Sequence, residues 1–301
     1  MNPIRTLPGL VSMVKKDCQP KRIAVAWAQD PNTIGAVIRG VSEGFVHAIM
    51  IGNREDIISL AKQQGTDAGI FEIVPAPDPQ TAVRMSTDMV KKGDADILMK
   101  GLVGTELFLK AVLEKETGLL PPKNVLSYVC ALEIPGYHRL LFITDTAVLP
   151  FPDLKQKVEM VDYAVKMARQ FGIDHPKVAL IEPTEKITSG IPSTIDDAMN
   201  CKMAVQGRFG DCTVDGPMDV FLACDPEAAQ IKNVPNLIRG EADVLVFPSL
   251  AAANVFYKGL VRFSGAELAG LIQGTVKPVV VMSRSESVIS VSYTHLTLPT
   301  N

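Results

Sequence analysis

The runs IAVAWA (residues 23–28) and VHAIMI (46–51) give the clearest indication of how this chain folds. Both are short and almost wholly apolar, and a longer amphipathic stretch lies between them. Strand, helix and strand in this order are typical of α/β layers with a parallel sheet. Apolar runs of the same kind recur at 97–99, 140–143, 178–181, 244–247 and 279–282. The alternation therefore predicts an α/β fold with a largely parallel sheet.

Residues 153–171 form the clearest predicted helix. The segment begins after Pro152 and ends at Gly172, a residue type that commonly follows the last turn of a helix. Apolar side chains recur along it at helical spacing, at Leu154, Val158, Val161, Val165 and Ala168. Residues 125–143 differ, because two apolar runs flank a Pro–Gly pair, which predicts an antiparallel hairpin or a crossing between domains.

Two segments of the chain resemble each other. GDADILMKGLVG (93–104) and GEADVLVFPSLA (240–251) both run from Gly, an acid, Ala and Asp into apolar residues, a break and a predicted helix. Two α/β domains that share one strand–loop–helix unit explain the likeness. The general similarity of buried strand–helix units explains it equally well, and the sequence leaves both explanations open.

Composition narrows the classes of protein. The 301 residues are 47% hydrophobic and 21% charged, which excludes a disordered or collagen-like chain. With a net charge of −3, the protein has no overall positive potential to attract nucleic acid or an acidic membrane. The charge-free stretch 244–257 is shorter than the roughly 20 apolar residues of a membrane-spanning helix. Five cysteines without a C-x-x-C pair, and an N-terminus without a secretory pattern, predict free thiols in a reducing cytoplasm.

Candidate site residues follow from one rule of parallel α/β sheets, in which ligands bind outside the carboxyl ends of the strands. Polar or glycine residues in those places are Lys100, Gly101, Thr144, Asp145, Glu182, Asp215, Ser249, Ser283 and Arg284. Arg284 beside the Ser283 hydroxyl can bind a phosphate with a planar pair of donors, or it is a surface arginine that starts a helix.

Three residues after the predicted strand 97–99 are weaker candidates. Lys100 can place an ammonium over an anion or simply be an exposed lysine, and Gly101 allows a ligand to approach the backbone. Thr105 is expected to cap the helix that it opens. Because Asp211, Asp215 and Asp219 fall on a strand and a turn, we expect them to have hydrogen-bonding roles rather than to hold a cation.

Several kinds of chemistry lack a sequence signal. The chain has no His-x-x-x-His or other metal-ligand spacing, so no metal is expected. No cysteine has an obvious base beside it, so no thiol nucleophile is indicated. The P-loop, the Rossmann dinucleotide fingerprint and the G-x-S-x-G elbow are all missing from the sequence.

Five long motifs resemble the phosphate acetyltransferase and phosphate butyryltransferase family. They are DADILMKGLVGTELFLKAVL (94–113), EIPGYHRLLFITDTAVLPFPDL (133–154), GIPSTIDDAMNCKMAVQGRFGDCTVDGPMD (190–219), GEADVLVFPSLAAANVFYKGLVRFSGAELAGLI (240–272) and KPVVVMSRSES (277–287). The resemblance covers roughly residues 15–288, and the length and first motifs are closer to the butyryl branch.

The resemblance implies a fold and a reaction. The fold is that of isocitrate and isopropylmalate dehydrogenases, two α/β domains with a central cleft. We expect a first domain of residues 1–137 with 277–288, a second of 138–276, and a tail at 289–301 outside the fold. The reaction is that of butanoyl-CoA with phosphate to give butanoyl phosphate and CoA, by direct attack in a ternary complex. Acetyl-CoA as the substrate, or a non-catalytic protein that binds CoA or acyl phosphate, are the alternatives.

The resemblance also implies roles for residues. Arg284 binds phosphate, and Ser283 donates to the reacting sulfur or oxyanion. Substrate contacts come from Lys100, Gly101, Thr105, Thr144 and Asp145, with the last two at the domain junction. The substrates are acyl-CoA and inorganic phosphate, with no cofactor and no metal, in a cytoplasmic homo-oligomer. A decarboxylating dehydrogenase of the same fold is a further alternative, and it needs clustered aspartates on helices.

The C-terminal tail departs from the family pattern. SVSYTHLTLPTN (290–301) has no charge and no helical period, and it looks like a translated sequencing adaptor. In the acetyl branch a catalytic aspartate lies seven residues after the serine of the Ser–Arg pair, and here that position is Ser290. The general base is therefore unassigned, and Glu286 is either a substitute or a helix cap.

Overall fold

The computed structural model describes residues 3–17 and 19–281. The chain divides into two compact units. Unit 1 comprises Met1–Gly9 and Ser127–Leu268, and unit 2 comprises Leu10–Leu126 and Ala269–Asn301. The first helix, α1 (Leu7–Asp17), begins in unit 1 and ends in unit 2.

The sheet of unit 2 has the strand order β3-β2-β1-β4-β11-β10. Its strands are β1 (Lys21–Ala26), β2 (Val46–Gly52), β3 (Glu72–Pro75), β4 (Ile97–Lys100), β10 (Glu267–Gln273) and β11 (Val279–Val280). All neighbouring pairs are parallel except β10 with β11. The carboxyl ends of β1, β2, β3 and β4 therefore meet at one edge of the sheet.

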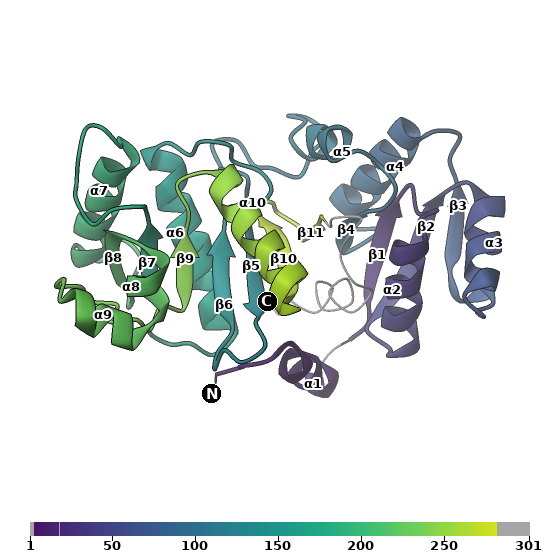
Figure 1. Cartoon of the computed structure of the whole chain (residues 1–301). Helices are drawn as coiled ribbons and strands as arrows, with labels where there is room; N and C mark the ends of the chain where they lie inside the picture. The colour runs from purple at the N-terminus through teal and green to yellow at the C-terminus, as the bar shows by residue number, and fades with distance from the viewer. Residues whose placement is uncertain (1–2, 18, 282–301) are drawn as a thin grey trace. The chain divides into compact units, whose positions relative to one another are not determined.

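Helices connect the strands of unit 2, and Figure 1 shows α2, α3 and α4 beside this sheet. They are α2 (Pro31–Ser42), α3 (Arg54–Gln63), the short η1 (Ala68–Ile70), α4 (Pro79–Lys92) and α5 (Thr105–Val112). Asp30, Asn53 and Asp78 each cap the helix that follows by accepting from backbone N–H groups of its first turn. These caps, with Pro at the first position of α2 and α4, fix where each helix begins.

The sheet of unit 1 has the strand order β5-β6-β9-β7-β8. Its strands are β5 (Ser127–Glu133), β6 (Leu141–Thr144), β7 (Lys177–Ile181), β8 (Thr213–Met218) and β9 (Val244–Val246). The helices are α6 (Leu154–Gln170), α7 (Ser193–Val205), α8 (Val220–Cys224), α9 (Pro226–Lys232), α10 (Leu250–Gly259) and the π-helix η2 (Leu260–Ser264). β6, β9, β7 and β8 are parallel neighbours, and β5 is antiparallel to β6.

The expected α/β class with a largely parallel sheet is confirmed. The predicted strand segments correspond to β1, β2, β4, β6, β7, β9 and β11, with ends that differ by one or two residues. The predicted helix 153–171 is α6, which begins after a capping box of Asp153 and Gln156. The two similar segments, 93–104 and 240–251, each contain a strand and the loop that leads into a helix. The first belongs to unit 2 and the second to unit 1.

The predicted hairpin lies within unit 1. β5 pairs antiparallel with β6, with Val129 opposite Thr144 and Leu132 opposite Leu141, around the turn at Pro135 and Gly136. The sequence-based division assigned residues 127–137 to the first domain, whereas the compact units separate at Ser127. The same division assigned 269–276 to the second domain, whereas these residues belong to unit 2.

Each sheet is buried on both faces. In unit 2 Ala24 and Val25, consecutive residues of β1 whose side chains point to opposite faces, are both fully buried. In unit 1 Phe142 of β6 packs edge-on against Phe171 at the end of α6, with ring centroids 5.1 Å apart. Runs of apolar residues without alternation reflect this two-sided burial. No helix of residues 3–17 and 19–281 has the length and apolar character needed to cross a membrane.

Candidate active site

Lys100 ends strand β4, and its side chain is 5% exposed. The ammonium donates to the carbonyl oxygens of Gly101 and Val103, at 3.2 Å each. The sequence left open an exposed lysine or an ammonium placed over an anion, and the exposed alternative is wrong. The buried charge instead fixes the course of the loop between β4 and α5, because two carbonyls of that loop converge on it.

Gly101 is packed against the end of β1. Its N–H donates to the carbonyl of Ala26 at 3.0 Å, and the next N–H, of Leu102, donates to that of Trp27 at 2.8 Å. A Cβ at position 101 would lie 2.5 Å from the Trp27 oxygen. Only glycine fits there, so the close approach that this residue permits is to protein backbone.

Thr105 does not cap α5. The N-cap is Gly104, Thr105 is the first helical residue, and no side chain of the described chain bonds the N-cap end of this helix. The expected cap is wrong, because Thr105 could be the N-cap only of a helix that begins at residue 106, and α5 begins at residue 105. The N–H groups of the first turn of α5 thus remain available, whereas in neighbouring α4 the Asp78 side chain accepts from the N–H of Thr81.

A cavity of about 460 Å³ lies at these two helix starts. It is lined by Pro79, Leu102, Val103, Gly104, Glu106, Leu107 and Lys110. The uncapped N-terminus of α5 and the exposed Lys110 supply positive charge, and Glu106 supplies negative charge. The volume suits a small ligand, and the cavity is at the carboxyl edge of the sheet. It can accept an anionic group beside apolar walls.

Asp145 follows β6 in unit 1 and is 1% exposed. Its Oδ2 accepts from the Ser127 hydroxyl at 2.9 Å and from the Tyr128 N–H at 3.0 Å. Its Oδ1 accepts from the N–H groups of Ala147 and Val148, both at 2.8 Å. The pKa of Asp145 is raised, because burial disfavours its charged form by more than these four hydrogen bonds favour it.

The environment of Asp145 makes it an organiser of the loop after β6. Each carboxylate oxygen already accepts two hydrogen bonds, so it has no ready place for a proton taken from a substrate. Thr144 is fully buried beside it, with its hydroxyl 3.4 Å from that of Ser127. Asn254 of α10 donates to the Thr146 carbonyl at 3.0 Å, which braces the same loop.

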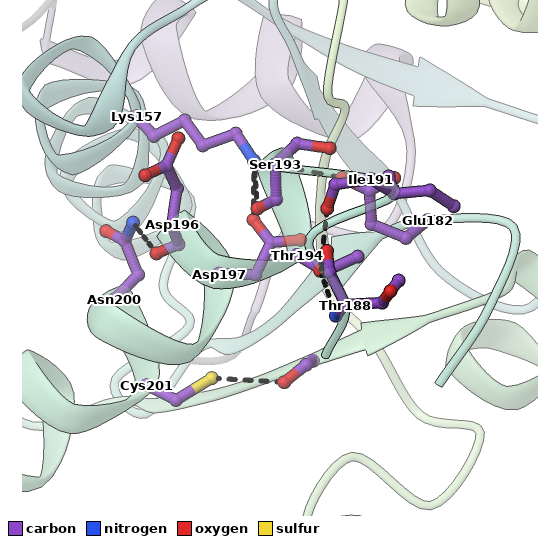
Figure 2. Close-up of polar contacts among 11 residues, drawn as sticks. Lys157, Glu182, Thr188, Ile191, Ser193, Thr194, Asp196, Asp197, Asn200 and Cys201 are labelled. Carbon is purple, nitrogen blue, oxygen red and sulfur yellow. Dashed lines mark hydrogen bonds and ion pairs between the residues drawn. The ribbon is translucent and has the colours of Figure 1, made fainter. Parts of the chain in front are cut away.

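A third strand end carries a cluster that the sequence analysis missed in part. Glu182 follows β7, and Lys157 of α6 and Asp197 of α7 lie beside it (Figure 2). All three residues are at least 96% buried. Lys157 Nζ is 2.6 Å from Asp197 Oδ1 and 3.9 Å from Glu182 Oε1. Position 157 lies three residues after Leu154 and four before Val161, on the apolar face of the helix. A lysine among the apolar residues of one helix face is the sequence feature that indicates such a buried charged cluster.

The aspartates of β8 and the turn after it have the hydrogen-bonding roles that were expected. Asp215 accepts from the N–H groups of Gly216 at 2.9 Å and Leu237 at 2.6 Å. Asp219 caps α8 and pairs with Lys232 at 2.6 Å. Within the described ranges, no three His, Cys, Asp or Glu side chains are grouped so that they could hold a metal ion.

The structure divides the remaining candidates between the two units. Lys100, Gly101 and Thr105 surround one loop of unit 2, and Thr144 and Asp145 lie on one loop of unit 1. Ser283 and Arg284, with Glu286 and Ser290, lie outside the described residues. The last described residue, Val281, directly follows β11, which pairs parallel with β4, the strand that ends at Lys100.

Known proteins are similar to this chain in both sequence and fold. The profile of the family described as phosphate acetyl/butaryl transferase matches residues 79–297. The phosphate butyryltransferase of Clostridium acetobutylicum is 40% identical over 277 residues, 92% of each chain. The phosphate acetyltransferase of Rhizobium meliloti is 34% identical over 269 residues, 89% of this chain and 85% of the relative.

A solved structure gives the same result for the fold. The branched-chain phosphotransacylase from Enterococcus faecalis V583 superimposes with a TM-score of 0.80 at 28% identity, over 91% of this chain and 96% of that one. The family match extends over most of the chain, and the identity to curated relatives spans nearly all of it. This chain therefore belongs to the phosphate acetyl/butaryl transferase family.

Proposed function

We propose that this protein is a phosphate acyltransferase that converts butyryl-CoA and inorganic phosphate into butyryl phosphate and CoA. A phosphate oxygen attacks the thioester carbonyl carbon, a C–O bond forms, and the C–S bond breaks. The electron pair of that bond leaves on the CoA sulfur, which takes up a proton. The observation that carries the proposal is the 40% identity to a phosphate butyryltransferase over 92% of both chains.

The chemistry of the step suits the residues of the chain. Phosphate is an anion that must be held against a neutral thioester, which calls for cationic and N–H donors. We assign phosphate binding to Arg284 and donation to the sulfur or oxyanion to Ser283, by resemblance to the family. The cavity beside the uncapped start of α5, with Lys110 on its wall, is suited to an anionic part of either substrate.

The loop residues act mainly by position in this proposal. Lys100 holds the carbonyls of Gly101 and Val103 and so fixes the start of α5, where Thr105 presents its N–H. Asp145, with Thr144 beside it, shapes the loop after β6. These residues supply substrate contacts through the backbone that they order. The reaction as written needs no cofactor and no metal, and we place it in a cytoplasmic homo-oligomer.

Acetyl transfer is the second candidate, because a phosphate acetyltransferase is 34% identical over most of the chain. The identity to the butyryl relative is higher, which favours the longer acyl group.

A comparison of acetyl-CoA, propionyl-CoA and butyryl-CoA as substrates tests the proposal. The expected result is phosphate-dependent release of thiol with the highest kcat/KM for butyryl-CoA. Highest kcat/KM for acetyl-CoA would replace the first candidate by the second. Binding of CoA without turnover of any of the three would contradict both and indicate a non-catalytic protein.

A further inference from the structure

The buried cluster of Lys157, Asp197 and Glu182 has more acceptors than donors. Lys157 Nζ donates to Asp197 Oδ1 at 2.6 Å and to the Ser193 carbonyl at 3.0 Å. Asp197 Oδ2 and Glu182 Oε1 are buried without a hydrogen-bond partner among the described residues. Figure 2 shows the three side chains converging from α6, α7 and the end of β7. A buried oxygen with no donor costs free energy unless it binds a proton or another donor.

The charges of the cluster lead to the same conclusion. One ammonium faces two carboxylates, so the fully ionised cluster carries a net negative charge in a place where each side chain is at most 4% exposed. A single buried charge without compensation is strongly unfavourable, and one bound proton removes it. Burial raises the pKa of Asp197 to about 7, with Lys157 lowering it and Glu182 raising it.

Other titratable groups near Asp197 add to the negative potential. Asp196 on α7 raises the pKa of Asp197 further. Cys201, one turn later on α7, has its own pKa raised, chiefly by burial, with contributions from Asp215 of β8 and from Asp197. Among these charge partners from α6, α7, β7 and β8, Lys157 carries the positive charge. The net charge of the cluster therefore depends on Lys157.

The cluster also fixes a loop at the carboxyl edge of the sheet. The loop from Glu182 to Ser193 connects β7 to α7, and both of its ends meet the Lys157 ammonium. Thr194 of α7, directly after the loop, accepts from the Thr188 N–H at 2.9 Å and donates to the Ile191 carbonyl at 2.7 Å. Loss of the Lys157 contacts would release both ends together.

We propose that Asp197 and Glu182 share one proton at neutral pH and that, with Lys157, they act as positioning residues for the loop 182–193. Loss of this proton strengthens the pair of Asp197 with Lys157, but it also places two ionised carboxylates in the same buried cluster. Their repulsion loosens the hold on Glu182, the first residue of the loop. Because loops at this edge of an α/β sheet bind ligands, the proton couples the position of the loop to pH near neutrality. This catalytic consequence rests on the proposed acyl transfer, whereas the shared proton does not.

Carbon-13 NMR of protein labelled at the Asp and Glu carboxyl carbons tests the shared proton directly. One carboxyl of the pair should stay protonated at pH 5.5 and titrate near 7, and its signal should vanish in Asp197→Asn or Glu182→Gln. In Lys157→Met the titration should move up by more than one pH unit. The matched control is Lys166→Met, on the same helix, whose lysine is 63% exposed and pairs with Asp162 at the surface. Ionisation of both carboxyls below pH 5 would overturn the proposal.

Hydrogen exchange tests the positioning role. The Thr188 N–H should exchange at least tenfold faster in Lys157→Met than in wild type, and at the wild-type rate in Lys166→Met. Should Lys157→Met not fold, Glu182→Gln serves, since it removes the charge that draws the first residue of the loop to the same ammonium. Equal Thr188 protection in wild type and the folded variant would overturn the role.

The pH profile of kcat/KM links the cluster to catalysis. The wild-type profile should bend near pH 7, and Asp197→Asn should lose that bend; identical profiles would overturn the catalytic coupling. A wild-type protein without any acyl transfer would contradict the proposed function, while the NMR titration would still decide the shared proton.

Discussion

The hydroxyl of Ser127 donates to Oδ2 of Asp145 across 2.9 Å, and this bond joins the first residue of β5 to the loop after β6. The same carboxylate binds the N–H groups of Tyr128, Ala147 and Val148. One buried side chain thus sets the path of the backbone on two neighbouring strands. Replacing the Asp145 carboxylate, which accepts all four hydrogen bonds, should therefore lower the free energy of unfolding more than removing any one of the four donors.

Asp145→Asn should therefore destabilise the protein strongly. The new amide would face at least one of the four donors with its own N–H₂, which leaves buried groups unpaired at a cost of about 3 kcal/mol. Ser127→Ala, which removes one donor, should cost about 1–2 kcal/mol. Urea unfolding measures both, and Asp174→Asn at an exposed aspartate is the control. A cost for Asp145→Asn no larger than for the control would contradict the described hydrogen bonds.

Gly101→Ala tests the close approach of the β4–α5 loop to β1. A Cβ at this position would meet the Trp27 and Ala26 carbonyl oxygens at 2.5 and 2.8 Å, so the loop must shift. We expect a loss of about 2–4 kcal/mol in the free energy of unfolding, together with lower activity. Gly104→Ala is the matched control, because a Cβ there meets no atom within 4 Å. Equal stability of the two variants would argue against the packing of this loop.

Two lysines near the same loop should behave differently. Lys100→Met removes a buried ammonium from two carbonyls and should cost about 2–4 kcal/mol in stability. Lys110→Met, on the exposed wall of the cavity, should change stability by less than about 0.5 kcal/mol and raise the KM of an anionic substrate. Thermal unfolding and steady-state kinetics separate the two effects. An unchanged KM for both phosphate and acyl-CoA in Lys110→Met would remove the cavity from the substrate path.

Arg284→Ala should raise the apparent KM for phosphate at least tenfold, because a planar pair of donors to the anion is lost. Its effect on the KM for butyryl-CoA should be much smaller. Initial rates over a range of phosphate concentrations provide the measurement, with Arg262→Ala, at an exposed arginine of η2, as the control. A phosphate dependence equal to that of wild type would exclude Arg284 from phosphate binding.

Much of the fold follows from the pattern of apolar residues. Runs such as 23–28 and 46–51 are apolar on both sides because both faces of each sheet are covered, and the helix 153–171 has its apolar residues on one face. Strand ends were less exact, since hydrogen bonding with neighbours sets them. No feature of the sequence indicated that the compact units separate at Ser127 and Leu268, because contacts between residues far apart in the chain define these units.

The site was less predictable because its side chains act through tertiary contacts. Thr105 looked like a cap, yet Gly104 already takes the N-cap position. Gly101 suggested a ligand beside the backbone, and a neighbouring strand lies there instead. Lys157 is a charged residue on an apolar helix face, and its partner Asp197 lies 40 residues later in the sequence. No local pattern joins such a pair.

One assay measures the transfer of the acyl group from CoA to inorganic phosphate. Butyryl-CoA is incubated with the protein at increasing phosphate concentrations, and thiol release and acyl phosphate, trapped as the hydroxamate, are followed together. Acyl transfer to phosphate should give equal amounts of both products, and no thiol should be released without phosphate. Thiol release that proceeds equally without phosphate, with no hydroxamate formed, would contradict it.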